Sequence, residues 1–156
     1  MAHYLITGGC GFIGSHLVDK LLADGHRVRV LDDLSTGKRE NVPLDRLELV
    51  LGDVADPATV RRAMAGVDGC FHLAAIASVQ RANEDWSGAH RVNLTGSIAV
   101  LDAARTACDG GPAPVVYASS AAVYGDNPDV PLVEGAATRP LTAYGADKLG
   151  SEQHAR

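Results

Sequence analysis

A cluster of glycines close to the N-terminus constrains the fold of this chain more than any other feature. The apolar residues 4–6 lead into three glycines spaced three residues apart (Gly8, Gly11, Gly14), and an amphipathic pattern begins at Phe12. This order predicts a strand, a tight turn and a helix, because glycine accepts turn conformations and allows close packing of the helix on the strand. The first N–H groups of such a helix form a seat for a pyrophosphate. The residues expected to contact a dinucleotide are Gly8, Gly11, Phe12, Ile13 and Gly14.

A glycine triplet also occurs in ordinary turns, so a second signal is needed. The first predicted helix ends near Asp24 and Gly25, residues 28–31 have the character of a strand, and Asp32 follows 21 residues after Gly11. A carboxylate at about this spacing accepts both hydroxyls of an adenosine ribose and repels a 2′-phosphate. We therefore predict NAD rather than NADP, with Asp33 as a further contact. The alternative is that Asp32 only caps a turn.

Strand and helix patterns alternate along the rest of the chain. Residues 47–51, 69–75 and 115–118 have the apolar character of strands. Helical patterns cover residues 57–65, 88–108 and the segment from Thr142 onwards, and polar connections cover 34–44, 76–86 and 126–140. This alternation predicts one α/β domain with a parallel, doubly wound sheet and right-handed crossovers.

Several residues at the ends of predicted strands are suited to hold a cofactor, because open α/β sheets bind ligands at this edge. Asp53 is a candidate for the adenine amine, and the small residues at the end of the fourth predicted strand leave room for a cofactor backbone. Asn93 is a poor helix former inside a predicted helix, so it is either a simple exposed residue or a ligand of nearby backbone. The full expected set here is Asp53, Val54, Leu73, Ala74, Ala75, Asn93 and Ser119. His72 lies in an apolar strand, where a structural role is more typical than catalysis.

The predicted chemistry is concentrated in Ser120, Tyr144 and Lys148. Tyr144 and Lys148 are four residues apart, so on a helix they share a face. A phenol is a poor base at neutral pH, but a nearby ammonium and a nicotinamide stabilise the phenolate. Ser120 follows the fifth strand and can hydrogen-bond the same substrate oxygen. A Tyr and a Lys at this spacing also occur on helix faces without function, and the glycine turn and Asp32 make that alternative weaker.

Composition excludes several classes of partner. The 156 residues are 46% hydrophobic and carry a net charge of −5, and the 14 Lys and Arg are scattered, which argues against nucleic acid or an anionic membrane as a partner. No stretch is long and apolar enough to span a bilayer, and the first strand starts too early to leave room for a signal peptide. The three cysteines show no metal-ligand spacing, so no metal site is expected and reduced thiols in the cytoplasm are the expectation.

Taken together, these residues resemble the extended short-chain dehydrogenase/reductases, in particular the NAD-dependent sugar epimerase/dehydratase group. The resemblance covers essentially the whole chain, through Thr7-Gly8-x-x-Gly11-x-x-Gly14, Asp32, Gly52-Asp53-Val54, His72-Leu73-Ala74-Ala75, Asn93, Ser119-Ser120 and Tyr144-x-x-x-Lys148. It implies a Rossmann-type fold with NAD as cofactor. Asp147 stands where a serine is common in the family, and we interpret this difference as neutral.

Among the subfamilies, residues 31–37 and 119–126 look most like those of UDP-glucose 4-epimerases. Related dehydratases carry an Asp-Glu pair, and related decarboxylases a Glu, where this chain has Ala121 and Ala122. The resemblance implies reversible oxidation at the C4 hydroxyl of a UDP-sugar, in which Tyr144 takes the proton and NAD takes and returns the hydride. Another sugar dehydratase or a carbonyl reductase is the weaker alternative.

Members of this family are roughly twice as long, so the chain resembles their N-terminal half. We expect residues 1–156 to form an NAD-binding domain that lacks the family's last strands and its C-terminal substrate domain. The fifth strand would then present an unpaired edge, which favours a homodimer or a swapped assembly. Two functions therefore stay open: an epimerase, and an NAD-binding module without turnover.

Overall fold

The computed structural model describes residues 1–107 and 111–156. At its centre lies a five-stranded sheet in the order β3-β2-β1-β4-β5, in which every neighbouring pair is parallel. The strands are β1 (His3–Thr7), β2 (Arg27–Asp32), β3 (Glu48–Leu51), β4 (Gly69–His72) and β5 (Val115–Tyr117). The prediction of a parallel, doubly wound α/β sheet is confirmed.

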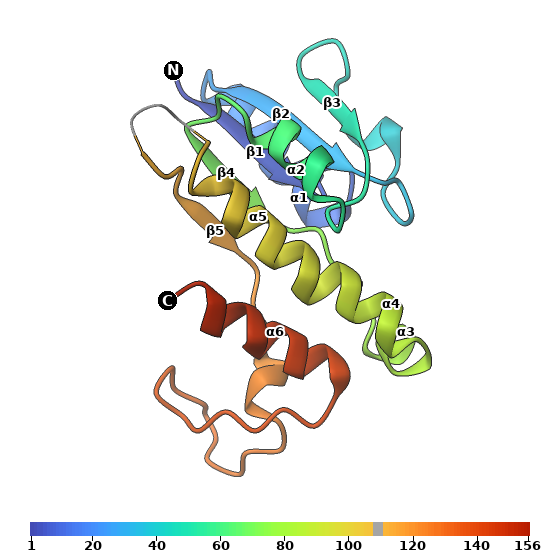
Figure 1. The fold of residues 1–156 in the computed structure, drawn as a ribbon, viewed down its shortest axis with the longest axis vertical. Coiled ribbons are helices and arrows are strands. Elements are labelled where there is room, and N and C mark those ends of the chain that lie inside the picture. The colour runs from blue at the N-terminus through green and yellow to red at the C-terminus, as the bar shows by residue number, and fades with distance from the viewer. Residues whose placement is uncertain (108–110) are drawn as a thin grey trace.

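Helices connect the strands and cover both faces of the sheet (Figure 1). The α-helices are α1 (Phe12–Ala23), α2 (Pro57–Met64), α3 (Val79–Glu84), α4 (Trp86–His90), α5 (Gly96–Ala104) and α6 (Ala143–His154). Two 3₁₀ turns, η1 (Arg39–Asn41) and η3 (Ala121–Tyr124), lie in the longer connections. A π-helical segment, η2 (Arg91–Thr95), joins α4 to α5. Segments α4, η2 and α5 therefore form one continuous helix, and α6 packs beside it.

The sheet divides the core into two layers, because successive residues of a strand point to opposite faces. Leu5 belongs to the cluster between the sheet and the helices α2 and α5, together with Leu31, Val60, Met64 and Val100. Ile6 belongs to the cluster under α1, together with Val18, Leu21, Leu22 and Val30. Leu5 and Ile6 are both completely buried. The central strand β1 is thus covered on both sides, as its apolar sequence requires.

Several predicted boundaries are wrong. The fourth strand, predicted over 69–75, already ends at His72. The predicted polar connection 76–86 contains helix α3, whose sequence is polar because it buries only Ala82, and Ser78 caps it by accepting a hydrogen bond from the Arg81 N–H. The helix predicted over 88–108 begins earlier, at Trp86, changes to a π-helix in η2 and ends at Ala104. Its predicted end at Cys108 lies outside the described residues.

Side chains cap the starts of two helices, α2 and α6. Asp56 precedes α2 and accepts hydrogen bonds from the N–H groups of Ala58 and Thr59. Thr142 precedes α6 and accepts one from Gly145. These side chains satisfy donors that have no partner inside the helix. The start of α6, which carries Tyr144, is therefore set by its own sequence.

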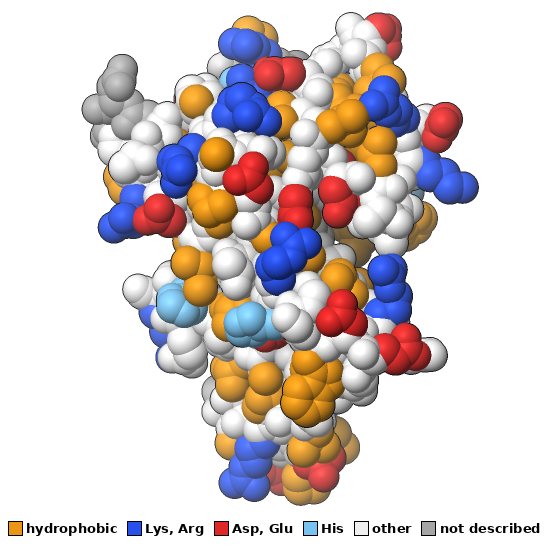
Figure 2. Space-filling model, turned by 45° about the vertical axis from the view of Figure 1, so that its right-hand side comes forward, with side chains coloured by type: hydrophobic (Ala, Val, Ile, Leu, Met, Phe, Trp, Pro, Cys, Tyr) orange, Lys and Arg blue, Asp and Glu red, His pale blue; other side chains and the backbone are white. Residues whose placement is uncertain are grey.

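The surface in Figure 2 carries charged side chains of both signs, interspersed without a large area of one sign. Hydrophobic side chains gather in the lower part of this view. Among the exposed large hydrophobic residues, Trp86 and Leu141 each keep 68% of their surface accessible. Within residues 1–107 and 111–156, no helix has the length and apolar character needed to cross a membrane.

Candidate functional site

The strand order creates a crevice at the carboxyl edge of the sheet. The chain builds β1, β2 and β3 in one direction and then returns to place β4 on the other side of β1. Helices that leave β1 and β4 therefore go to opposite faces, and ligands of open α/β sheets bind at such a point. The glycine turn follows β1, and the segment Leu73–Ala75 follows β4.

The glycine turn is packed too closely for larger residues. Gly8 has φ +69°, and a Cβ atom on it would lie 2.8 Å from the Ala74 backbone nitrogen. A Cβ atom on Gly14 would overlap the Gly8 carbonyl oxygen, so helix α1 lies directly against the turn. Phe12 and Ile13, in the first turn of α1, are 80% and 68% exposed. The turn thus forms a backbone cradle at a helix N-terminus, which fits a pyrophosphate.

Asp32 lies against this turn, at the end of β2. It is 7% exposed, and its two carboxylate oxygens accept hydrogen bonds from the N–H groups of Cys10 (2.9 Å) and Leu34 (2.8 Å). Each oxygen keeps a lone pair for a ribose hydroxyl. Asp33 is exposed and bonds Ser35 instead. Burial and the Asp32 charge raise the pKa of the Cys10 thiol to about 11, so this thiol keeps its proton at neutral pH.

Tyr144 and Lys148 face the end of β5 from helix α6. The Lys148 Nζ atom donates to the Ala118 carbonyl oxygen at 2.8 Å and lies 5.9 Å from the centre of the Tyr144 ring. Lys148 is only 5% exposed. Burial lowers the pKa of this ammonium, and the Asp147 charge raises it in part.

Ser120 lies where α6 approaches the segment after β5. Its hydroxyl oxygen accepts a hydrogen bond from the Ala122 N–H at 3.1 Å and starts the turn η3. A Cβ atom on Gly145 would lie 2.6 Å from the Ala122 carbonyl oxygen, so α6 and η3 are in close contact. The structure therefore places the three predicted catalytic residues in one region at the carboxyl edge.

The remaining predicted cofactor residues lie in different environments. Asp53 forms an ion pair with Arg91 at 2.5 Å, and the Ser119 hydroxyl donates to Glu152 at 2.5 Å. Val54 packs in the core under α5, so only its backbone is available at the sheet edge. Leu73 and Ala74 donate their N–H groups to the Thr7 hydroxyl. None of these contacts tests whether the five residues bind a cofactor. The cofactor contacts of Asp53, Val54, Leu73, Ala74 and Ser119 stay predictions.

Asn93 is the one residue of the predicted set that is fully enclosed. It is 1% exposed, and its amide bonds both the N–H (2.8 Å) and the carbonyl (3.2 Å) of Ile76. Of the two readings left open by the sequence, the backbone ligand is the one that the structure supports. Asn93 holds the segment that follows Leu73–Ala75, so any effect on a cofactor is exerted through that segment.

Next to the crevice lies a buried row of hydrogen-bonded side chains that the sequence did not predict. The His72 ring lies between the Thr7 hydroxyl (2.7 Å) and the Ser97 hydroxyl (3.0 Å), and Ser97 donates to the Asn93 carbonyl at 2.6 Å. Burial, with a smaller effect of Lys148, lowers the pKa of His72 to about 3, so the ring is neutral. The prediction that His72 is structural agrees with these contacts. Thr7 belongs to the glycine motif, but its contact with His72 and that of Ser97 leave no local signal in the sequence, because the partners are distant.

Comparison with known proteins agrees with this geometry. Residues 4–156 match the model of the NAD dependent epimerase/dehydratase family. The UDP-glucose 4-epimerase of Mycolicibacterium smegmatis is 42% identical over an alignment 154 residues long, which covers 95% of this chain and 48% of that protein. The chain spans about half the length of the curated relatives it matches.

Solved structures give the same result. The UDP-glucose 4-epimerase of Thermus thermophilus in complex with NAD has a TM-score of 0.89 and 40% identity, covering 98% of this chain and 49% of its own. The Thermotoga maritima enzyme with UDP-glucose has a TM-score of 0.91 and 32% identity, with 98% and 50% covered. The fold, the geometry at the carboxyl edge of the sheet and the family match all agree. This chain belongs to the NAD dependent epimerase/dehydratase family.

Proposed function

We propose that this chain binds NAD and forms the cofactor-binding half of a nucleotide-sugar 4-epimerase of the UDP-glucose/UDP-galactose type. The observation that carries the proposal is the position of Tyr144 and Lys148. Helix α6 brings them to the same sheet edge as the glycine turn and Asp32, although more than 100 residues separate them in sequence. The epimerases to which the chain is similar support the substrate class.

The proposed NAD site uses the cradle and the carboxylate next to it. The backbone of the glycine turn and the start of α1 would bind the pyrophosphate, and Asp32 the adenosine ribose. Asp53 is the proposed partner of the adenine amine, and Leu73, Ala74 and Ala75 would lie along the cofactor. Tyr144 and Lys148 would contact the nicotinamide end. NAD, when bound, supplies the acceptor and donor of hydride.

The proposed chemistry of the protein is proton transfer at the sugar C4 hydroxyl. Tyr144 accepts the proton, and Lys148 stabilises the resulting phenolate because its ammonium lies beside the ring. The lysine bond to the Ala118 carbonyl holds the ammonium near Ser120. Ser120 would orient the substrate hydroxyl toward Tyr144. Ala121 and Ala122 offer no extra acid, which favours epimerisation over elimination.

The first test is binding of NAD and NADP measured by calorimetry. We expect NAD to bind more tightly, and Asp32→Asn to weaken NAD binding by about 10- to 100-fold, because a charge-assisted hydrogen bond to the ribose is lost. Asp102→Asn is the matched control, since it removes an exposed carboxylate paired with Arg105. Equal affinity for NAD and NADP in the unmodified chain would contradict the assignment of Asp32.

The second test separates the enzyme from a binding module. UDP-galactose is added to the chain with NAD, and epimerised product and NADH absorbance are followed. Turnover that Tyr144→Phe abolishes would support the epimerase. NAD binding without turnover would favour the module, a second candidate that rests on the chain spanning about half of its relatives.

The domain, assembly and location of the protein also remain proposals. We propose that residues 1–156 fold as one NAD-binding domain and that the exposed edge of β5 pairs with a second copy of the chain. The cytoplasmic location is inferred from the cysteines, of which Cys10 and Cys70 are free thiols. Cys108 lies outside the described residues.

A further inference from the structure

Cys10, inside the glycine turn, has both of its backbone groups bonded to residues at and after the end of β2. Its N–H donates to the Asp32 carboxylate at 2.9 Å. Its carbonyl oxygen accepts from the Lys38 N–H at 3.1 Å and from the Asn41 side-chain amide at 2.8 Å. The glycine turn is therefore fastened both to the carboxylate and to the connection that follows it.

Residues 34–41 lie against the glycine turn from the side of this connection. Leu34 has φ +59°, a conformation that residues other than glycine rarely adopt, and its N–H donates to the Asp32 carboxylate at 2.8 Å. A Cβ atom on Gly37 would lie 2.9 Å from the Cys10 Cβ atom, so the segment packs directly on this side chain. Cys10 is completely buried. Segment 34–41 is thus part of its cover.

Asn41 bonds this segment to the turn through its side chain. It is the last residue of η1, and Val42, which follows it, is buried in the core cluster under α1. This anchor holds the backbone of Asn41 close to the turn. Lys38 reaches the Cys10 carbonyl through its backbone, so of the two donors only the Asn41 amide can be removed by a substitution.

These hydrogen bonds form a closed circuit that includes Asp32. One carboxylate oxygen is bonded to Cys10 of the turn, the other to Leu34 of the segment, and Asn41 bonds the segment back to Cys10. The distance between the two N–H groups that hold the carboxylate depends on how closely the segment lies on the turn. Asn41 therefore acts on the direction of the Asp32 carboxylate through Cys10.

We propose that Asn41 is a positioning residue of the NAD site. Its amide keeps segment 34–41 closed on the glycine turn and thereby holds the Asp32 carboxylate in place for the adenosine ribose. The contact between Asp32 and the ribose rests on the proposed function. The closure of the segment does not, because its hydrogen bonds form without a cofactor.

Alkylation of the cysteines by N-ethylmaleimide, followed by peptide mass spectrometry, measures this closure. Cys70 is 2% exposed and belongs to the core cluster on the other face of the sheet, so it reports unfolding of the whole chain. We expect Cys10 to react faster than Cys70, at a rate that a low concentration of urea hardly changes, because opening the segment exposes little surface.

Asn41→Ala should raise the rate of Cys10 alkylation by about 2- to 10-fold, because the closed segment loses one hydrogen bond. An unchanged Cys10 rate in the folded variant would overturn the proposal. Equal rates at Cys10 and Cys70 would also overturn it, since Cys10 would then be reached only by unfolding of the whole chain.

Calorimetry with NAD tests whether the closure serves Asp32. We expect Asn41→Ala and Asn41→Asp, which has the same shape but no donor, to weaken NAD binding by about 2- to 10-fold. In the Asp32→Asn background, Asn41→Ala should weaken it much less, because the path through the carboxylate is already lost. Fully additive effects of the two substitutions would overturn a role through Asp32.

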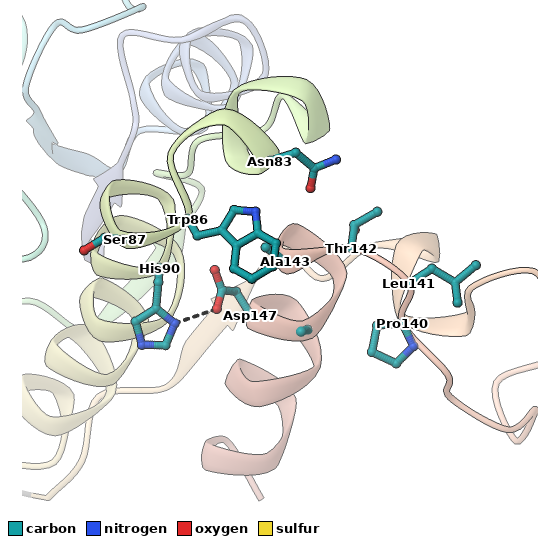
Figure 3. Close-up of a pocket in the computed structure, with 10 residues that line it drawn as sticks. Asn83, Trp86, Ser87, His90, Pro140, Leu141, Thr142, Ala143 and Asp147 are labelled. Atoms are coloured by element: carbon teal, nitrogen blue, oxygen red, sulfur yellow. Dashed lines mark hydrogen bonds and ion pairs between the residues drawn. The ribbon is translucent and has the colours of Figure 1, made fainter.

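Two other asparagines provide matched controls. Asn127 donates to the Ala137 carbonyl at 3.4 Å in another connection, so Asn127→Ala should change neither Cys10 alkylation nor NAD affinity. Asn83 lies at a pocket lined by residues of α3, α4, α6 and the segment before α6, and by none of the glycine turn (Figure 3). Asn83→Asp adds the same charge as Asn41→Asp. An equal loss of NAD affinity in both would assign the effect to charge and contradict the proposal.

A measurement on the unmodified chain serves if the variants do not fold. NAD should slow the alkylation of Cys10, because a cofactor that needs the closed segment stabilises it. NAD that binds without slowing this reaction would overturn the proposal.

The two measurements separate this inference from the proposed function. If the unmodified chain does not bind NAD while Asn41→Ala still speeds Cys10 alkylation, the proposed function fails and the closure by Asn41 stands. If NAD binds and folded Asn41→Ala leaves Cys10 alkylation unchanged, the proposed function stands and the role of Asn41 fails.

Discussion

His72 has a defined tautomer because its neighbours allow only one hydrogen-bond pattern. Thr7 already accepts from the N–H groups of Leu73 and Ala74, so its hydroxyl must donate to His72 Nδ1. Ser97 donates to the Asn93 carbonyl, so its oxygen accepts from Nε2–H. Both ring nitrogens are satisfied only when the ring is neutral. A second proton on Nδ1 would face the Thr7 hydroxyl proton and break the hydrogen bond between these two groups.

This neutral ring makes stability depend on pH. The pKa of His72 is about 3 in the folded chain and about 6.5 when unfolded, so between these values the unfolded chain binds more protons and stability falls as pH falls. From pH 7 to pH 5, we expect the wild-type chain to lose on the order of 2 kcal/mol more free energy of unfolding than His72→Gln. Urea unfolding at both pH values measures this difference.

His16→Gln is the control for that experiment, because His16 is an exposed histidine on α1. The free energy of unfolding of His16→Gln should change with pH as that of the wild type does. If wild type and His72→Gln lose the same free energy of unfolding between pH 7 and pH 5, then His72 accepts a proton in the folded chain. That result would contradict the hydrogen bonds of its ring with Thr7 and Ser97.

Helix α6 is positioned by contacts at its start and along its side. The Thr142 hydroxyl caps its first turn, and the close approach of Gly145 to Ala122 fixes its distance from η3. On its inner side, the Ser151 hydroxyl donates to the Asp147 carbonyl at 3.0 Å and lies 3.4 Å from the Asn93 carbonyl, which accepts from Ser97. Asn93 belongs to the π-helical segment η2. Such segments often occur at functional sites.

The cap at Thr142 gives a prediction for the helix as a unit. Thr142→Ala removes the acceptor for the Gly145 N–H, and we expect it to lower the free energy of unfolding by about 0.5–2 kcal/mol. Thr142→Ser keeps the hydroxyl and should retain most of the stability. Urea unfolding compares the two. Equal losses in both variants would show that packing of the threonine methyl group, and not the cap, stabilises the start of α6.

Within the residues that the structure describes, the sheet has β3 and β5 as its edge strands. Val116 in the middle of β5 is 59% exposed, and Leu51 at the end of β3 is 48% exposed. An exposed apolar edge strand is a template for pairing with another chain, and a charge on it prevents pairing. The α4–α6 side also exposes apolar surface, at Trp86 and Leu141. Association through β5 is therefore one of several geometries that the surface permits.

Light scattering on three variants tests association through β5. We expect the unmodified chain to dimerise at high concentration and Val116→Lys to be monomeric. Leu51→Lys, the matched change at the opposite edge, should still dimerise. Dissociation by Trp86→Gln instead of Val116→Lys would place the contact on the α4–α6 side, and a clean monomer in the unmodified chain would contradict the hypothesis altogether.

Features that depend on residues close together in the chain could be predicted from the sequence. The strands and the glycine turn follow from neighbours within a few positions. The position of Asp32 beside the turn could also be predicted, because parallel strands end at one edge of the sheet. The polar helix α3 was missed, since its single buried residue gives almost no periodic pattern.

Features that depend on distant contacts were decided by packing. His90 and Asp147 are 57 residues apart, Asp53 and Arg91 are 38 apart, and His72 and Ser97 are 25 apart. No local pattern encodes such pairs, because each forms only when two elements pack against each other. The sequence thus specified which groups are available for cofactor and proton chemistry. The packing of α6 against η2 and η3 decided where Lys148 stands, because its ammonium reaches the Ala118 carbonyl only when α6 lies beside that segment.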